Sequence, residues 1–215
     1  MTMYTAIIIL FLFSSVIAII LDMRKSPLFT WVKPLPLCIL ISALVITGLQ
    51  QELSAGWLIV AGLVLGMGGD VLLTRDRLFL AGLASFLAGH IFYIVFFTVK
   101  SSTFSPILLF FILAPVLYAV IFYARLPREK SSMRLPVGVY MTVITIMVIT
   151  AANLHLNTPG GQELFAAGAL FFFLSDSILA WHMMIASVRY DSLLVMSTYY
   201  TGQFCIASGI LLPLL

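Results

Sequence analysis

Residues 62–97 read GLVLGMGGDVLLTRDRLFLAGLASFLAGHIFYIVFF, two apolar stretches joined by the short basic segment TRDR. The segment predicts two membrane-length helices connected by a tight turn. Asp70 lies in the first stretch and His90 in the second. A carboxylate within a membrane span costs at least ~2.5–3.5 kcal/mol, and an ionisable residue placed there usually marks a function. These two residues are therefore the first candidates for a functional site.

The composition extends this membrane character to the whole chain. Of the 215 residues, 62% are hydrophobic and 9% are charged, whereas a soluble domain has about 25% charged residues. The mean hydropathy is +1.17. We therefore predict an all-α polytopic membrane bundle, with residues 1–215 forming a single transmembrane helical domain.

Hydropathy, at ~20 residues per span, predicts eight transmembrane helices. Their ranges are 5–21, 31–49, 55–73, 78–98, 104–124, 135–153, 164–185 and 192–213. The connections are short, so helices adjacent in sequence are expected to pack antiparallel. The first span has no basic segment before it and no small-residue cleavage site after it, so it is interpreted as an uncleaved span.

The basic residues predict the orientation. With the eight spans above, all of the eleven Lys and Arg except Lys100 lie on one side of the membrane. By the positive-inside rule this side is cytoplasmic and both termini are outside. The charge pattern thus reflects topology, and no nucleic-acid partner is predicted. Such a chain suits a bacterial inner membrane or an internal eukaryotic membrane.

Polar residues of several predicted helices lie at similar depths in the cytoplasmic half of the bundle. They form the candidate site: Lys33, Asp70, His90, Tyr93, Tyr140, Asp176, Tyr200 and Gln203. Asp176 has no Lys or Arg within two helical turns along its own span, which makes a purely interfacial role difficult to explain.

The other candidates have simpler alternatives. Asp70 could be an interfacial carboxylate paired with Arg75 or Arg77. His90 and Tyr93 could be packed core residues, and Lys33 could be a snorkelling anchor. No span carries a His-x-x-x-His or Glu-x-x-His pair, and no nucleophile elbow is present. No metal and no cofactor are therefore predicted.

Three pairs of short motifs correspond between the two halves of the chain. They are Lys33-Pro34 with Arg134-Leu-Pro136, Gly69-Asp70 with Ser175-Asp176, and Gly89-His90 with Gly202-Gln203. The offset is four predicted helices, so a duplication would give a parallel 4+4 repeat about an axis along the membrane normal. Asp70 and Asp176 would then face each other near this axis.

Five of the short motifs resemble the pattern of the YhhN family, which includes the TMEM86 lysoplasmalogenases of animals. They are Lys33-Pro34, Gly69-Asp70, Gly89-His90 with Tyr93, Ser175-Asp176 and Tyr199-Tyr200-x-x-Gln203. The resemblance covers nearly the whole chain, with Gly202 standing where an alanine is expected. It implies a lysophospholipid substrate and hydrolysis of the vinyl ether bond of lysoplasmalogens. The products would be a fatty aldehyde and glycerophospho-ethanolamine or -choline.

The candidate residues suit this chemistry. Protonation of the alkenyl carbon gives an oxocarbenium-like cation, which water captures, so an acid and a second carboxyl group are needed, as in glycosidases. We expect Asp176 to be the acid and Asp70 the base or cation stabiliser. His90, Tyr93, Tyr140, Tyr200 and Gln203 would orient water and glycerol hydroxyls, and Lys33 would meet the phosphate.

A proton-coupled small-molecule transporter is the alternative, because intramembrane Asp and His residues also form proton relays. A transporter requires a polar path across the whole membrane. The outer halves of the predicted spans 55–73, 164–185 and 192–213 are almost wholly apolar, which favours a pocket open to one side.

Overall fold

A computed structural model describes residues 3–51, 53–101, 103–127, 131–158 and 162–214. Its helices are α1 (Met3–Met23), α2 (Phe29–Val32), α3 (Leu35–Gln50), α4 (Trp57–Leu73), α5 (Phe79–Lys100), α6 (Leu108–Arg125), α7 (Ser131–Asn157), α8 (Glu163–Met184) and α9 (Asp191–Leu211). Short 3-10 turns span Ser54–Gly56, Asp76–Leu78 and Leu212–Leu214. These described residues contain no strand, and the predicted all-α class is confirmed.

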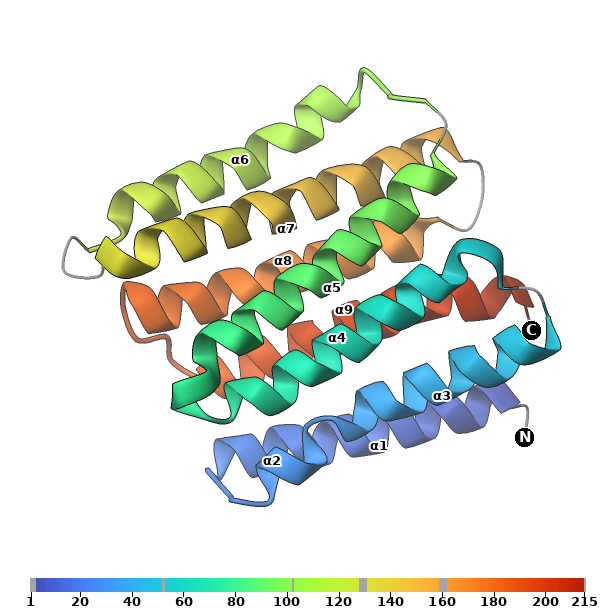
Figure 1. The fold of residues 1–215 in the computed structure, drawn as a ribbon, viewed down its shortest axis with the longest axis horizontal. Coiled ribbons are helices and arrows are strands. Elements are labelled where there is room, and N and C mark those ends of the chain that lie inside the picture. The colour runs from blue at the N-terminus through green and yellow to red at the C-terminus, as the bar shows by residue number, and fades with distance from the viewer. Residues whose placement is uncertain (1–2, 52, 102, 128–130, 159–161, 215) are drawn as a thin grey trace.

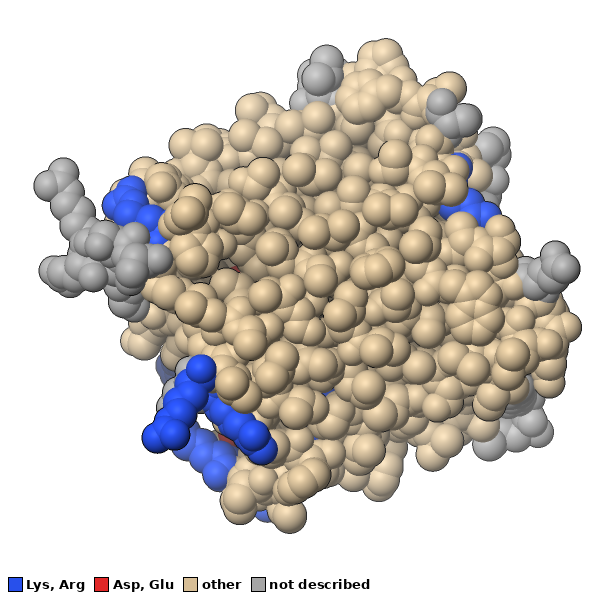
Figure 2. Space-filling view, in the orientation of Figure 1, with Lys and Arg blue, Asp and Glu red and all other residues tan. Residues whose placement is uncertain are grey.

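Several of the helices have the length and composition of membrane spans. Within the described residues, six segments are long and apolar enough to cross a bilayer: Tyr4–Met23, Phe29–Gln50, Ser54–Leu73, Phe79–Lys100, Met133–Asn157 and Glu163–Met184. The apolar segment Ile112–Arg125 is shorter. The side of the bundle seen in Figure 2 is almost entirely uncharged, as expected for a surface that faces lipid. The prediction of an integral membrane protein is therefore confirmed.

The helices lie side by side in one bundle (Figure 1). α1 and α3 form one edge and α6 and α7 the opposite edge, with α4, α5, α8 and α9 between them. Both ends of the chain lie at the end of the bundle opposite the α4–α5 turn. Lys and Arg side chains gather mainly at the α4–α5 end (Figure 2). The bundle thus has one basic end and one end with the termini.

Two helix pairs pack with unusually close backbones. A Cβ at Gly89 on α5 would lie 3.0 Å from the carbonyl oxygen of Gly62 on α4. On α8 and α9, a Cβ at Gly168 would lie 2.8 Å from the carbonyl oxygen of Gly202, and one at Gly202 would lie 3.0 Å from that of Gly168. Small residues allow such close approach between membrane helices. Each pair fixes a helix that carries one of the two candidate aspartates.

A Gly168→Ala variant tests this packing. The added methyl group would meet the backbone of α9, which cannot move aside as a side chain can, so we expect a loss of roughly 1–3 kcal/mol of unfolding free energy. Gly68→Ala is the matched control, because its Cβ would contact only Ser85 Oγ, at 3.2 Å. Denaturant titration of the purified protein, followed by circular dichroism, measures both. Equal stability of the two variants would contradict the close α8–α9 contact.

The predicted span 31–49 corresponds to the apolar segment Phe29–Gln50, and the structure shows a break within it. The structure ends α2 at Val32 and begins α3 at Leu35, with Lys33 and Pro34 between them. Neither Pro34 nor Pro36 has an N–H to donate to the helical ladder. The Tyr200 hydroxyl donates to the Lys33 carbonyl at 2.9 Å, which secures the break against α9. At the other edge, α7 begins at Ser131 rather than at 135.

Candidate active site

A pocket lies in the half of the bundle nearer the α4–α5 turn. It contains about 730 Å³ of empty space, including its open mouth. Its polar lining comes from five separate parts of the chain and consists of Lys33, Asp70, Tyr140, Ser175, Asp176 and Tyr199. The rest of the lining is formed by Leu, Phe, Val, Ala and Met side chains. The pocket is therefore a mainly apolar chamber with a few polar groups, which is typical of a ligand site.

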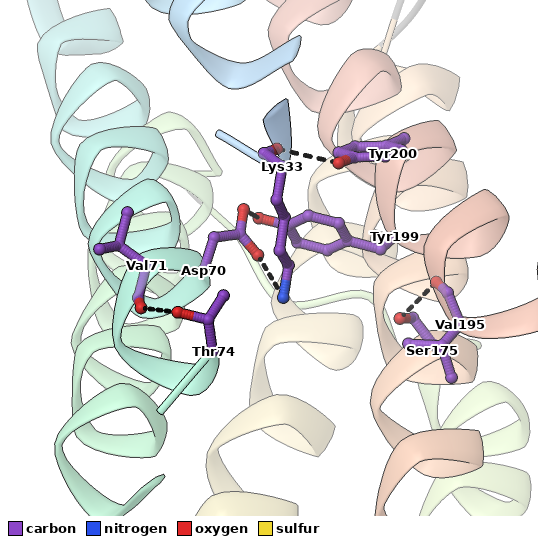
Figure 3. A network of polar contacts seen from close by, with 8 residues as sticks. All are labelled: Lys33, Asp70, Val71, Thr74, Ser175, Val195, Tyr199 and Tyr200. Atoms are coloured by element: carbon purple, nitrogen blue, oxygen red, sulfur yellow. Dashed lines mark hydrogen bonds and ion pairs between the residues drawn. The ribbon is translucent and has the colours of Figure 1, made fainter. Parts of the chain in front are cut away.

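Asp70 is buried and has a partner on each carboxylate oxygen (Figure 3). Lys33 Nζ lies 3.2 Å from Oδ1, and the Tyr199 hydroxyl donates to Oδ2 at 2.7 Å. Of the described cations, neither Arg75 nor Arg77 forms the ion pair with Asp70 that the sequence offered as an alternative. A buried charge needs such a partner, because an unpaired carboxylate in an apolar interior is strongly disfavoured.

Lys33 has contacts at both its side chain and its backbone. Its side chain is 12% exposed, which differs from the exposed head of a snorkelling anchor. Its ammonium group lies 5.6 Å from the centre of the Phe29 ring. Because Tyr200 binds its carbonyl, both its backbone and its side chain are fixed. Lys33 thus reaches Asp70 from the break between α2 and α3.

Asp176 has a different environment. The Tyr140 hydroxyl donates to its Oδ2, and His90 Nε2 lies 3.8 Å from the same oxygen. Among the described residues, no Lys or Arg forms an ion pair with Asp176. The neighbouring Ser175 hydroxyl donates to the Val195 carbonyl on α9 at 3.0 Å (Figure 3). The two aspartates therefore line one pocket with unlike partners.

His90 lies behind Asp176 and does not line the pocket. Its ring is 4.7 Å from the Phe172 ring and 5.4 Å from the Tyr140 ring, with edge-to-face geometry in both contacts. Within the described part of the chain, neither ring nitrogen makes a hydrogen bond. His90 is thus a buried imidazole whose nearest acidic group is Asp176.

Tyr93 and Gln203 form a third buried contact, also outside the pocket lining. The Tyr93 hydroxyl donates to Gln203 Oε1 at 2.8 Å. Gln203 Nε2 lies 3.1 Å from the position that a Cβ of Gly66 would take, so the glycine leaves the space that the amide needs. This pair joins α5 to α9 one helical turn from Tyr199.

The structure thus brings Lys33, Asp70, Tyr140 and Asp176 to the pocket and places His90 against Asp176. Tyr200 contacts the backbone of Lys33, and Tyr93 and Gln203 pair with each other away from the pocket. The sequence prediction missed Tyr199 as a site residue. Tyr199 and Gln203 are four positions apart and share a helix face, whereas Tyr200 is rotated away, and this spacing could have identified Tyr199.

Two buried carboxyl groups with different partners at one pocket can act as separate proton donor and acceptor. Among the described residues, no three His, Cys, Asp or Glu side chains are grouped as metal ligands. The hydroxyls of Tyr140 and Tyr199 in the lining donate hydrogen bonds to Asp176 and Asp70, respectively. The arrangement suits proton transfer to and from an apolar ligand that carries a polar head.

Comparison with known proteins identifies relatives of the chain. The sequence model of the YhhN family matches residues 28–210. The chain is 29% identical to mouse lysoplasmalogenase TMEM86B over 177 residues, which is 81% of this chain and 73% of the mouse protein. It is 34% identical to human lysoplasmalogenase TMEM86A over 155 residues, covering 69% of this chain and 63% of the human protein. No solved structure matches the chain.

Proposed function

The chain belongs to the YhhN family, and we propose that it is a membrane-embedded hydrolase that cleaves the vinyl ether bond of lysoplasmalogens. The products are a fatty aldehyde and glycerophospho-ethanolamine or -choline. One observation carries the proposal: two buried carboxyls with unlike partners line a single, mainly apolar pocket. The lysoplasmalogenase relatives support the same reaction.

In the proposed reaction the two aspartates have different roles. Asp176, which has no Lys or Arg partner among the described residues, donates its proton to the alkenyl carbon distal to the ether oxygen. Asp70, whose negative charge is balanced by Lys33, stabilises the oxocarbenium ion and accepts a proton from the attacking water. The resulting hemiacetal then breaks its bond to the glycerol oxygen: Asp70 returns its proton to this oxygen, which leaves as a hydroxyl, and Asp176 takes the proton of the hemiacetal hydroxyl as the aldehyde forms, so both carboxyls regain their starting states.

The other residues act through the two carboxyls or through the substrate. Tyr140 holds Asp176 through its hydrogen bond, with the His90 ring beside the same carboxyl, and Tyr199 holds Asp70. Tyr200 positions Lys33 through its backbone. Lys33 has two N–H donors beyond the one aimed at Asp70, and we assign these to the substrate phosphate. Tyr93 and Gln203 join α5 to α9 and support the helix that carries Tyr199, since they lie outside the pocket lining.

The proposal includes a topology of eight spans with both termini outside the cytoplasm. It is supported by the gathering of basic side chains at the end of the bundle away from the termini. A parallel 4+4 repeat is supported by the glycine contacts, since Gly62 and Gly168 each stand eight positions before an aspartate. The pocket would then open to the cytoplasmic leaflet of a bacterial inner membrane.

The test is aldehyde release by the purified protein in lipid nanodiscs, coupled to an aldehyde dehydrogenase. Alkenyl lysophospholipids with ethanolamine and choline headgroups are expected to release aldehyde. The matched alkyl ether lipids, which lack the double bond that is protonated, are expected to release none. Folded protein that releases no aldehyde from either alkenyl lipid would overturn the hydrolase and favour a transporter.

A further inference from the structure

A second hollow lies between α6 and α7, the pair at one edge of the bundle (Figure 1). It holds about 1620 Å³ of empty space, open side included. Val116, Ala119 and Val120 line it from α6, and Val143, Ile146 and Ile149 line it from α7. We call this hollow the α6–α7 groove.

The two threonines that line the α6–α7 groove leave its walls apolar. Thr142 and Thr145 both line it. The Thr142 hydroxyl donates to the Gly138 carbonyl at 2.9 Å, and the Thr145 hydroxyl donates to the Met141 carbonyl at 2.7 Å. Because both hydroxyls are bonded to their own helix, these residues do not need a polar ligand in the groove. Its walls suit a hydrocarbon chain.

One end of the α6–α7 groove carries a positive charge. The Arg134 guanidinium lies 4.8 Å from the centre of the Tyr123 ring, and its Nη1 donates to the Leu126 carbonyl at 3.4 Å. A guanidinium has five N–H donors, and the hydrogen bond to Leu126 uses one of them among the described contacts. In the described part of the chain Arg134 forms no ion pair with a carboxylate. An apolar channel that ends at an arginine matches the shape and charge of a phospholipid.

The groove also adjoins the candidate active site. Met141 on α7 lines both the α6–α7 groove and the pocket that holds Asp176. Methionine is unbranched and flexible, so its side chain adapts readily to a passing ligand. From Met141 to Ile149 the groove follows α7 for about 12 Å, at ~1.5 Å per residue. Met141 is thus the lining residue that the groove and the pocket share.

We propose that the α6–α7 groove is the docking site from which a single-chain phospholipid passes from the bilayer into the active site. Its phosphate lies against Arg134, its chain follows α6 and α7, and Met141 separates it from Asp176. The inference rests on the proposed function for the identity of the substrate. A lipid with a single chain fits this site because the hollow is one groove between two adjacent helices and borders one pocket.

Photolabelling tests the docking site without depending on turnover. The probe is a lysophospholipid with a diazirine near the end of its chain, used with the wild-type protein in nanodiscs. Label is expected on peptides of α6 and α7, and excess alkenyl lysophosphatidylcholine is expected to suppress it. Label elsewhere, or equal suppression by dioleoyl phosphatidylcholine, would overturn the inference, since the groove would then be an ordinary bilayer contact.

A matched pair of variants tests the same site by kinetics. Ala119→Trp fills the groove, whereas Ala114→Trp places the same side chain on the exposed surface of α6 outside the groove. We expect Ala119→Trp to raise KM for a hexadecenyl lipid roughly tenfold, because several methylenes lose their apolar contacts. A hexenyl lipid, too short to reach along the groove, is expected to keep its KM in both variants.

The two proposals fail in distinguishable ways. Absence of aldehyde from every lipid, together with label on α6 and α7, would refute the hydrolase while leaving a lipid-docking groove. Normal aldehyde release, together with an unchanged KM for the hexadecenyl lipid in Ala119→Trp, would refute the docking site and leave the hydrolase.

Discussion

The Asp176→Asn variant is expected to lose aldehyde release by a factor of roughly 10²–10⁴ while remaining folded, the range seen when a general acid is removed. An Asn side chain keeps the size of the carboxyl and still accepts the hydrogen bond that Tyr140 donates. It has no acidic proton to give to the alkenyl carbon. The effect should therefore appear in kcat, measured by the coupled aldehyde assay.

Asp191→Asn is the control for this substitution. Asp191 stands at the start of α9 and is partly exposed, 3.6 Å from His182, and it does not line the pocket. We expect it to retain wild-type turnover. Full activity of Asp176→Asn, with circular dichroism and melting temperature like those of the wild type, would exclude Asp176 as the acid. Loss of activity in both variants would indicate a general effect of removing charge.

The sequence was sufficient to predict the features that depend on local pattern. The helix pair formed by residues 62–97 appears as α4 and α5, because two long apolar stretches around TRDR have few other ways to satisfy their backbone in a bilayer. The depth of Asp70 and Asp176 followed from counting residues along their helices. The structure places both at one pocket.

The partners of these residues could not be predicted, because they depend on contacts between distant parts of the chain. Arg75 and Arg77 are near Asp70 in sequence, yet the cation that pairs with it is Lys33. Lys33 lies between the end of α2 at Val32 and the start of α3, far from Asp70 in the sequence. Similarly, the choice between Tyr199 and Tyr200 depends on the rotation of α9, which hydropathy does not determine.

The ion pair between Asp70 and Lys33 is expected to contribute strongly to the unfolding free energy of the protein. Lys33→Met removes the ammonium group but keeps an unbranched chain of similar size, which leaves Asp70 buried with Tyr199 as its remaining hydrogen-bond donor. Removing one partner of a buried ion pair typically costs about 3–5 kcal/mol. We expect a loss of this order in unfolding free energy, measured by denaturant titration in detergent. Lys100→Met, at the exposed end of α5, should change it by less than about 0.5 kcal/mol.

The double variant Lys33→Met with Asp70→Asn separates stability from catalysis. Without the carboxylate there is no unpaired buried charge, and the Asn oxygen can still accept the Tyr199 hydroxyl, so most of the lost stability should return. Turnover should not return, because Asp70 is then absent as the base. A double variant as unstable as Lys33→Met alone would show that Lys33 acts through packing. A double variant that regains turnover would show that Asp70 is not needed for the reaction and that its ion pair with Lys33 is structural.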